Sequence, residues 1–228
     1  MRLGLRLPQR VGTDLRHDVT EVAGAAERAG FDSVWAWERL LFPVAPRDSF
    51  TPGAPWPSAY RQAADPLTVL AAAAVVTERV RLGTSVIVAG LHQPLQLAKR
   101  FATLDQISGG RVVAGLGTGW AVDEFEAVGM AKSERGRLLD ETLDVFDAAW
   151  GPDPVNYRGP HTLIDNAYVL PKPLRRFRSS WPAMSMSAPP EVPMRVCWNG
   201  LPDVPTVGCR FSRPRAPPVL RSFARRGT

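Results

Sequence analysis

Three residues of the sequence have side chains that could transfer a proton or bind an anion next to an apolar segment. Glu38 and Arg39 directly follow the aromatic run 31–37, and His92 follows the apolar run 80–88. Histidine exchanges a proton near neutral pH, whereas an arginine keeps its charge and can only stabilise an anion. A structural interpretation stays open for each, because exposed Glu–Arg pairs contribute little and a lone loop histidine is seldom catalytic. We predict Glu38, Arg39 and His92 as the candidate catalytic residues.

A glycine-rich stretch, residues 112–125 (VVAGLGTGWAVDEF), joins an apolar run to an acidic, helix-like segment. Gly115, Gly117 and Gly119 allow a ligand to approach the backbone closely, and the helix that follows could hold an anion at its start. A dinucleotide-binding fingerprint requires a further glycine where this chain has Trp120, and it belongs to the first strand–helix unit. A dinucleotide site is therefore disfavoured, and a tight turn without a ligand remains the alternative. Trp120 either walls a pocket or packs in the core.

Strands and helices alternate along the first 150 residues. Asp65 is a predicted N-cap, Pro66 takes the first position of a helix, and Gly30 ends an earlier one. Long connections favour right-handed crossovers, which predicts a parallel α/β sheet that is either doubly wound or closed as a (β/α)₈ barrel. Residues 43–64, rich in proline, are predicted as a long loop that is functional or mobile. The predicted strands are 3–8, 31–37, 80–88 and 111–116, and the predicted helices are 14–29, 66–77, 94–108, 122–128 and 134–150.

The length and composition fit one soluble domain. The chain has 228 residues, of which 45% are hydrophobic, enough for a sizeable core. Its first residues, MRLGLRLPQR, lack the apolar segment of a signal peptide, and the longest apolar run, 69–76, is too short to span a bilayer. We therefore expect a cytoplasmic protein that does not bind a membrane. No metal site is expected, because Cys197 and Cys209 lack ligand spacing, and His17 and His161 have no supporting context.

Several segments, in order, resemble the luciferase-like monooxygenase superfamily, and most of all its branch that uses the deazaflavin coenzyme F420. They are AERAGFDSVWAWERLLFP (26–43), LGTSVIVAGLHQPLQLAKRFATLDQISGGRVVAGLGTGWAVDEFEAVG (82–129), ERGRLLDETLDVFDAAW (134–150) and a hairpin-like VNYRGPHTLIDNAYVLPKP (155–173). The resemblance covers residues 1–173 and implies a (β/α)₈ TIM barrel of the bacterial-luciferase type. It also implies an oxidoreductase or monooxygenase with coenzyme F420, or alternatively FMN, bound at the carboxyl ends of the strands. A small-molecule substrate is implied, and members of the superfamily are often homodimers.

The resemblance also assigns positions around the cofactor. Ser85 and Val86 match a non-prolyl cis peptide that backs the cofactor ring; the alternative is two ordinary strand residues. After the second strand, relatives that use coenzyme F420 often have Asp-His, whereas this chain has Glu38-Arg39. Arg39 cannot act there as an acid or base, and would instead stabilise an anionic reduced ring or a substrate carboxylate. His92 could form a hydrogen bond with the cofactor or the substrate. The loop beside the cofactor corresponds to Gly117, Thr118, Gly119 and Trp120.

The composition changes abruptly after residue 173. Residues 174–228 contain ten arginines, no lysine and nine prolines and carry a formal charge of +8, whereas residues 1–173 carry −2. No hydrophobic periodicity continues there, although the family continues with a fifth, apolar strand. Back-translation of residues 176–183 with G or C in third codon positions, read from each third base, gives Val-Pro-Val-Leu-Val-Ala-Gly. We therefore hypothesise a frameshift near residue 174.

This hypothesis sets the predicted domain organisation. Residues 1–173 form about the N-terminal half of the barrel domain, and residues 174–228 form an irregular tail. Half a barrel leaves the edge of the fourth strand unpaired, so an inactive, truncated fragment of the enzyme is an alternative function. A basic-tail nucleic-acid-binding protein is a further alternative. It is disfavoured, because the charge of the tail would then be a by-product of codon composition.

Overall fold

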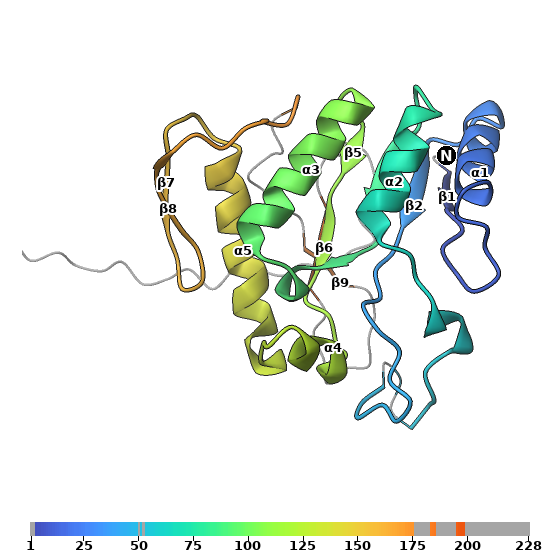
Figure 1. The fold of residues 1–228 in the computed structure, drawn as a ribbon, viewed down its shortest axis with the longest axis horizontal. Helices are drawn as coiled ribbons and strands as arrows, with labels where there is room; N and C mark the ends of the chain where they lie inside the picture. Colours follow the sequence, from blue (N-terminus) through green and yellow to red (C-terminus); the bar gives the residue numbers. More distant parts are fainter. Residues whose placement is uncertain (1–2, 50, 52, 176–182, 186–194, 199–228) are drawn as a thin grey trace, which may run out of the picture.

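The structure contains a parallel sheet that begins with the first strand of the chain (Figure 1). It is a computed structural model that describes residues 3–49, 51, 53–175, 183–185 and 195–198. Each strand of the sheet pairs in parallel with the next, as the predicted crossover connections require. The order across the sheet is β1 (Gly4–Arg6), β2 (Ser33–Ala36), β3 (Arg81–Thr84) and β5 (Val112–Val113).

Helices lie side by side over one face of this sheet, in chain order (Figure 1). Their ends follow the predicted signals. The Asp65 carboxylate accepts a hydrogen bond from the backbone N of Thr68 at 2.8 Å, and Gly109 follows the last helical residue 108 with a φ of 68°. Parallel strands inside and helices outside are the wall of a (β/α)₈ barrel. The helices are α1 (Asp18–Arg28), α2 (Pro66–Val75), α3 (Pro94–Ser108) and α5 (Arg135–Ala149).

The hydrophobic core lies between this sheet and the helices. α2 is apolar along much of its length because it packs against α1 on one side and α3 on the other. Phe101 of α3 and Phe146 of α5 meet edge to face, with ring centroids 5.8 Å apart. Two of the largest fully buried side chains are polar, Gln9 and Glu124, and both lie near the carboxyl end of β2. Buried polar groups of this size need specific partners, and both side chains bind backbone groups of the segment after β2.

The third and fourth predicted strands are each divided in two. The third becomes β3 and β4 (Ile87–Val88), and the fourth becomes β5 and β6 (Gly115–Gly117). β4 and β6 pair in parallel and belong to a second sheet. A local contact accompanies the division: the Thr84 hydroxyl accepts from the backbone N of Gly115 and donates to its carbonyl oxygen, both at 2.8 Å. A Cβ at Gly115 would lie 2.0 Å from the Thr84 carbonyl oxygen, so this approach requires glycine.

Two short strands lie in the region that the sequence predicts as irregular. They are β9 (Ala183–Ser185) and β10 (Arg195–Trp198), and β10 pairs antiparallel with both β6 and β9. A fifth barrel strand would instead pair in parallel with the fourth. The edge of β6 that no fifth parallel strand covers offers backbone N–H and carbonyl groups to any extended segment. This explains why β10 can pair with β6 in the antiparallel direction, which a barrel strand would not adopt. The remaining tail, with Cys209, lies outside the described residues, and the frameshift stays a prediction.

The predicted hairpin follows α5. Its strands are β7 (Val155–Arg158) and β8 (Leu163–Ala167), which pair antiparallel. Glu141 of α5 holds the hairpin: one carboxylate oxygen accepts from the backbone N of His161 at 2.8 Å, and the other lies 2.7 Å from its ring Nδ1. His161 therefore has a structural role in attaching the hairpin to the helix.

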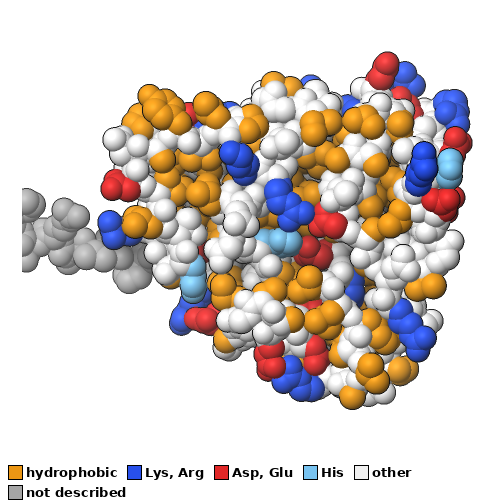
Figure 2. Space-filling view, viewed as in Figure 1, with side chains coloured by type: hydrophobic (Ala, Val, Ile, Leu, Met, Phe, Trp, Pro, Cys, Tyr) orange, Lys and Arg blue, Asp and Glu red, His pale blue; other side chains and the backbone are white. Residues whose placement is uncertain are grey.

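Charged side chains of both signs are interspersed on the face shown in Figure 2, where basic side chains do not gather into one patch. None of the helices in the described residues combines the length and the apolar character that a membrane crossing requires.

Candidate functional site

The predicted site residues lie together at the carboxyl edge of the strands. Residues 38 and 39 lie just after the end of β2, separated from it by Trp37, and Ser85 and Val86 connect β3 to β4. The peptide bond between Ser85 and Val86 is cis, as the sequence resemblance implies. From there β4 leads to Val88, which pairs with Gly117 at the end of β6. The cis peptide and the glycine-rich loop therefore come from neighbouring strands, on the side where (β/α)₈ barrels carry their functional residues.

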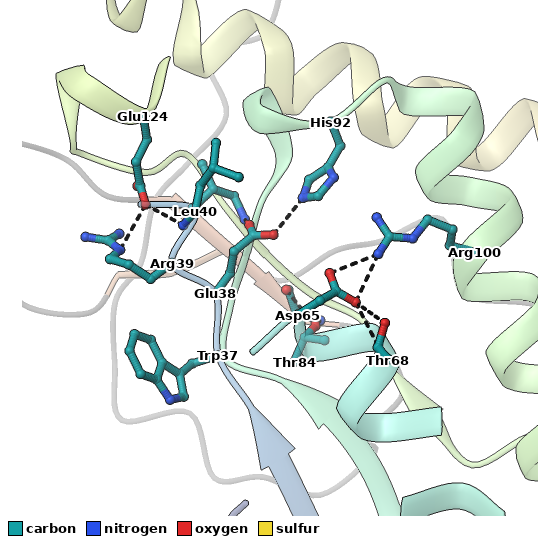
Figure 3. A network of polar contacts seen from close by, with 12 residues as sticks. Trp37, Glu38, Arg39, Leu40, Asp65, Thr68, Thr84, His92, Arg100 and Glu124 are labelled. Carbon is teal, nitrogen blue, oxygen red and sulfur yellow. Dashed lines mark hydrogen bonds and ion pairs between the residues drawn. The ribbon is translucent and has the colours of Figure 1, made fainter. Parts of the chain in front are cut away.

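Glu38 and His92 form a partly buried pair at this edge (Figure 3). Glu38 Oε1 lies 2.7 Å from His92 Nε2, and Oε2 accepts from the backbone N of Val88 at 2.6 Å. The two side chains are 7% and 18% exposed. An ionised carboxylate only accepts, so this contact places the proton of a neutral His92 on Nε2 and leaves the lone pair on Nδ1. Within the described residues Nδ1 has no hydrogen-bond partner, and it is the atom that can exchange a proton with a ligand.

Arg39 points away from this pair and toward Glu124 (Figure 3), and three aromatic rings around its guanidinium form an aromatic box. Its Nε lies 3.1 Å from Glu124 Oε1, and the two side chains are only 6% and 2% exposed. Cation–π attraction and the ion pair together offset part of the cost of burying the guanidinium. The guanidinium carbon lies 4.7 Å from the ring centroid of Trp120, 5.0 Å from that of Trp56 and 5.4 Å from that of Tyr60.

Burial changes the proton affinity of both partners of this ion pair. Burial raises the pKa of Glu124, although Arg39 and the backbone N of Leu40, which donates to Glu124 at 2.7 Å, act in the opposite direction. Burial likewise lowers the pKa of Arg39, and the charge of Glu124 opposes this change. Each charge therefore depends on the other, and neither can be removed alone without a large penalty.

Residues 43–64 form the predicted long loop, and polar contacts hold the loop against the start of α4 (Val122–Ala127). Asp48 accepts from the backbone N of Val122 at 3.1 Å, and its own carbonyl oxygen accepts from Trp56 Nε1 at 2.7 Å. These contacts hold the parts of the loop around Asp48 and Trp56 as a wall of the site, and the loop supplies two rings of the aromatic box. Exposed ion pairs between Arg47 and Asp123 and between Arg47 and Glu126 add to the attachment, as does a partly buried pair between Asp48 and Lys132.

Buried donors without partners mark the same region. Trp37 Nε1, Arg39 Nη1 and Thr118 Oγ1 are inaccessible to solvent and form no hydrogen bond within the described residues. Trp37 contacts the ring of Tyr60, with centroids 5.3 Å apart, which connects it to the aromatic box. Buried polar groups nearly always have partners. A ligand that offers oxygen acceptors fits these donors.

A cavity of about 280 Å³ opens on the other side of β2 from the helices. It is lined by Gly4, Arg6, Trp35, Ala36 and Ser85. Ser85 carries the carbonyl of the cis peptide, so the cavity and the predicted cofactor position share a wall.

The sequence of residues 1–192 matches the profile of a known family, described as luciferase-like monooxygenase. The chain belongs to this family. Its parallel α/β sheet is accordingly part of a luciferase-like barrel.

Relatives in the family use two kinds of cofactor. An uncharacterised protein of Mycobacterium tuberculosis is 35% identical over 69% of this chain and 57% of its own length. The F420-dependent glucose-6-phosphate dehydrogenase of Amycolatopsis mediterranei is 31% identical over 68% of this chain and 44% of its own length. The FMNH(2)-dependent dimethylsulfone monooxygenase of Pseudomonas fluorescens is 36% identical over a shorter stretch, 40% of this chain and 26% of its own length.

A solved structure shows the same fold. The monooxygenase RslO1 from Streptomyces bottropensis has a TM-score of 0.65 and 28% identity over 77% of this chain and 51% of its own. The chain thus spans about half the length of the curated and solved relatives that it matches.

The geometry brings most of the predicted site residues of this luciferase-like chain together, in two groups. Glu38 and His92 form one group with Ser85 and Val86. Glu38 accepts a hydrogen bond from the backbone N of Val88, which lies two residues after the cis peptide. Arg39 joins Trp120 in the other. The sequence did not predict Glu124, Trp56, Tyr60 or Trp37 as part of the site. The only local signal was the occurrence of aromatic residues inside the proline-rich loop. The described residues contain no group of three or more potential metal ligands.

Proposed function

We propose that this chain is an oxidoreductase that uses coenzyme F420, with FMN as the alternative, and acts on a small organic substrate. One observation carries the proposal: the cis peptide at Ser85–Val86, the glycine-rich loop and the Glu38–His92 pair meet at one edge of the sheet. The F420- and FMNH(2)-dependent relatives support the choice of cofactor.

The residues present fit such a group. Ser85 and Val86 would back the ring, and the loop from Gly117 to Trp120 would flank it. Gly119 has a φ of 71°, and a Cβ there would lie 2.5 Å from Val88 Cγ1, so the position of this loop against Val88 requires glycine. The unpaired donor at Thr118 can bind an acceptor of the cofactor. Either cofactor, when bound, accepts or donates a hydride.

His92 is the residue that we expect to move the proton in this reaction. Its Nε2–H is held by Glu38, and its Nδ1 can take a proton from a substrate hydroxyl or return one. Glu38 acts through His92 and is a positioning residue: it fixes the tautomer and the orientation of the ring. Arg39 is engaged by Glu124 and by aromatic rings, so we assign it to the wall of the pocket.

Titration of coenzyme F420 into the purified 228-residue protein, followed by coenzyme fluorescence, tests the proposal, and FMN is titrated in parallel. Saturable binding of one of them is expected. Gly119→Ala should weaken this binding by about tenfold or more, because the added methyl displaces Val88 and the loop.

Gly129→Ala is the matched control. Gly129 has a φ of 73°, close to that of Gly119, but a Cβ there would have nothing within 4 Å. The control variant should bind as the unchanged protein does. Absence of binding to both cofactors would favour the inactive-fragment alternative. Salt-dependent binding of nucleic acid without cofactor binding would favour the basic-tail alternative.

A further inference from the structure

We propose that Arg6 forms a subsite for an anionic, oxygen-bearing group, such as a carboxylate or a phosphate, in the cavity beside Ser85. The proposal rests on the proposed function, because it specifies the class of substrate that would meet the cofactor. The cavity measures about 280 Å³, and among the described residues that line it only Arg6 is charged.

The position of Arg6 follows from the strand pairing. Arg6 is the last residue of β1 and lies opposite Trp35 of β2, which lies opposite Gly83 of β3. Side chains at paired positions of a sheet point to the same face. Leu5, between Gly4 and Arg6, packs against the core under the helices, so Gly4 and Arg6 face the opposite, concave side. Arg6 therefore lies at the carboxyl edge of the sheet, on the face that carries the cavity.

Trp35 forms the floor of this cavity and has an ordered position. A Cβ at Gly83 would lie 2.3 Å from the Trp35 ring, and a Cβ at Gly4 would lie 2.5 Å from its Nε1. The ring therefore occupies the space over both glycines. Its Nε1 donates to Ser33 Oγ at 2.8 Å, which fixes the orientation of the indole. A ligand in this cavity would place its negatively charged group at Arg6, in the cavity that the Trp35 side chain also lines.

The charge of Arg6 is not neutralised within the described residues. Other arginines near the site pair with carboxylates at about 3 Å, Arg39 with Glu124 and Arg100 with Asp65. No carboxylate of the described residues pairs with Arg6, and none lines the cavity. A cation at the wall of a concave site attracts anions and binds them through charge-assisted hydrogen bonds. The anion can be a group of the substrate or the polar edge of the cofactor ring, since both present negatively charged oxygen.

Binding of sodium benzoate to the full-length protein, without any coenzyme, tests the subsite. Benzoate has the carboxylate that Arg6 would bind, and it is small enough for the cavity that Arg6 and Trp35 line. Calorimetry should show saturable binding, and the indole N–H resonance of Trp35 should shift. Arg6→Met should weaken benzoate binding by about tenfold or more, and Arg6→Lys should weaken it less.

Arg10→Met is the matched control, because Arg10 is also exposed but lines a different cavity, with Val11 and Ser58. It should leave benzoate binding unchanged. If benzoate binds equally to the Arg6→Met variant, or not at all, and Arg6→Met also leaves the Kd for coenzyme F420 unchanged, the subsite does not exist. An effect of Arg6→Met on coenzyme affinity alone identifies the cofactor ring as the source of the anion. Arg6-dependent benzoate binding by a protein that binds neither cofactor would contradict the proposed function and leave the subsite supported.

Discussion

Replacement of His92 by glutamine is expected to slow coenzyme turnover by about 10² to 10⁴-fold, the usual contribution of a positioned acid or base. Glutamine can keep a hydrogen bond to Glu38 but cannot carry a proton between a ligand and solvent. The rate of F420 reduction, with glucose 6-phosphate and simple secondary alcohols as first substrates, is the measurement. The affinity for the coenzyme should change little, because His92 acts in the proton transfer.

Two further variants separate proton transfer from loss of structure. Glu38→Gln should slow turnover less than His92→Gln, because Glu38 only orients the imidazole through its contact with Nε2 and does not itself carry the proton. His17→Gln should have no effect, since His17 lies at the start of α1, away from the site. A His92→Gln variant that keeps its rate within threefold of the unchanged protein would remove His92 from the mechanism.

Replacement of Arg39 by methionine is expected to destabilise the protein by about 3–5 kcal/mol, the cost of leaving one member of a buried ion pair alone. Without Arg39, Glu124 must either carry an uncompensated charge or take up a proton, in a position where its side chain is 2% exposed. Urea denaturation measures the effect. Arg47→Met is the control: it breaks an ion pair whose arginine is 51% exposed, and should cost about 0–1 kcal/mol.

The loss should depend on pH in a defined direction. Burial raises the pKa of Glu124, and removal of Arg39 raises it further, because Arg39 acts to lower it. A carboxyl group whose folded-state pKa lies above its unfolded value stabilises the fold below the unfolded pKa, and this contribution is lost as pH rises through the folded pKa. Arg39→Met should therefore lose less stability at about pH 5 than at about pH 8. A double variant, Arg39→Met with Glu124→Leu, should recover stability. Equal loss at both pH values would contradict the charge-based explanation.

Elements with strong local signals could be predicted from the sequence. Asp65 and Pro66 start α2 as predicted, and α3 ends before Gly109, because caps and helix-breaking residues act within one turn. The positions after strands were also predictable, since parallel strands bring their carboxyl ends to one edge. For this reason the sequence alone places Glu38, His92 and the cis peptide at Ser85 near one another.

Contacts between distant residues could not be predicted in this way. The division of two strands accompanies the contact between Thr84 and Gly115, which are 31 residues apart. Gln9 shows the same limit: its amide binds both the backbone N and the carbonyl oxygen of Trp37, 28 residues away. In the site, Arg39 is held by Glu124 from α4 and by rings from two loops. Spacing along the chain gives no sign of any of these partners.

Most of residues 174–228 lie outside the described part of the chain, so the structure does not test most of what the sequence predicts for this tail. Leu174 lies beside the start of the fourth strand. The carboxylate of Asp105 accepts hydrogen bonds from the backbone N of Leu174 at 2.8 Å and from the backbone N of Val112 at 3.4 Å. Among the described residues after this point, β10 pairs with β6 in the antiparallel direction. A frameshift near residue 174 remains our hypothesis, and sequencing of the gene across codon 174 tests it.

The most direct test of the central claim is a crystal structure of the 228-residue protein with coenzyme F420 bound. We predict that the deazaflavin ring contacts Ser85 and Val86 on one side and the loop from Gly117 to Trp120 on another. His92 should lie at the edge of the same pocket, with Nδ1 facing the space for the substrate. A ring bound at the amino ends of the strands, or at a surface remote from Ser85, would contradict the proposed site and with it the role of His92.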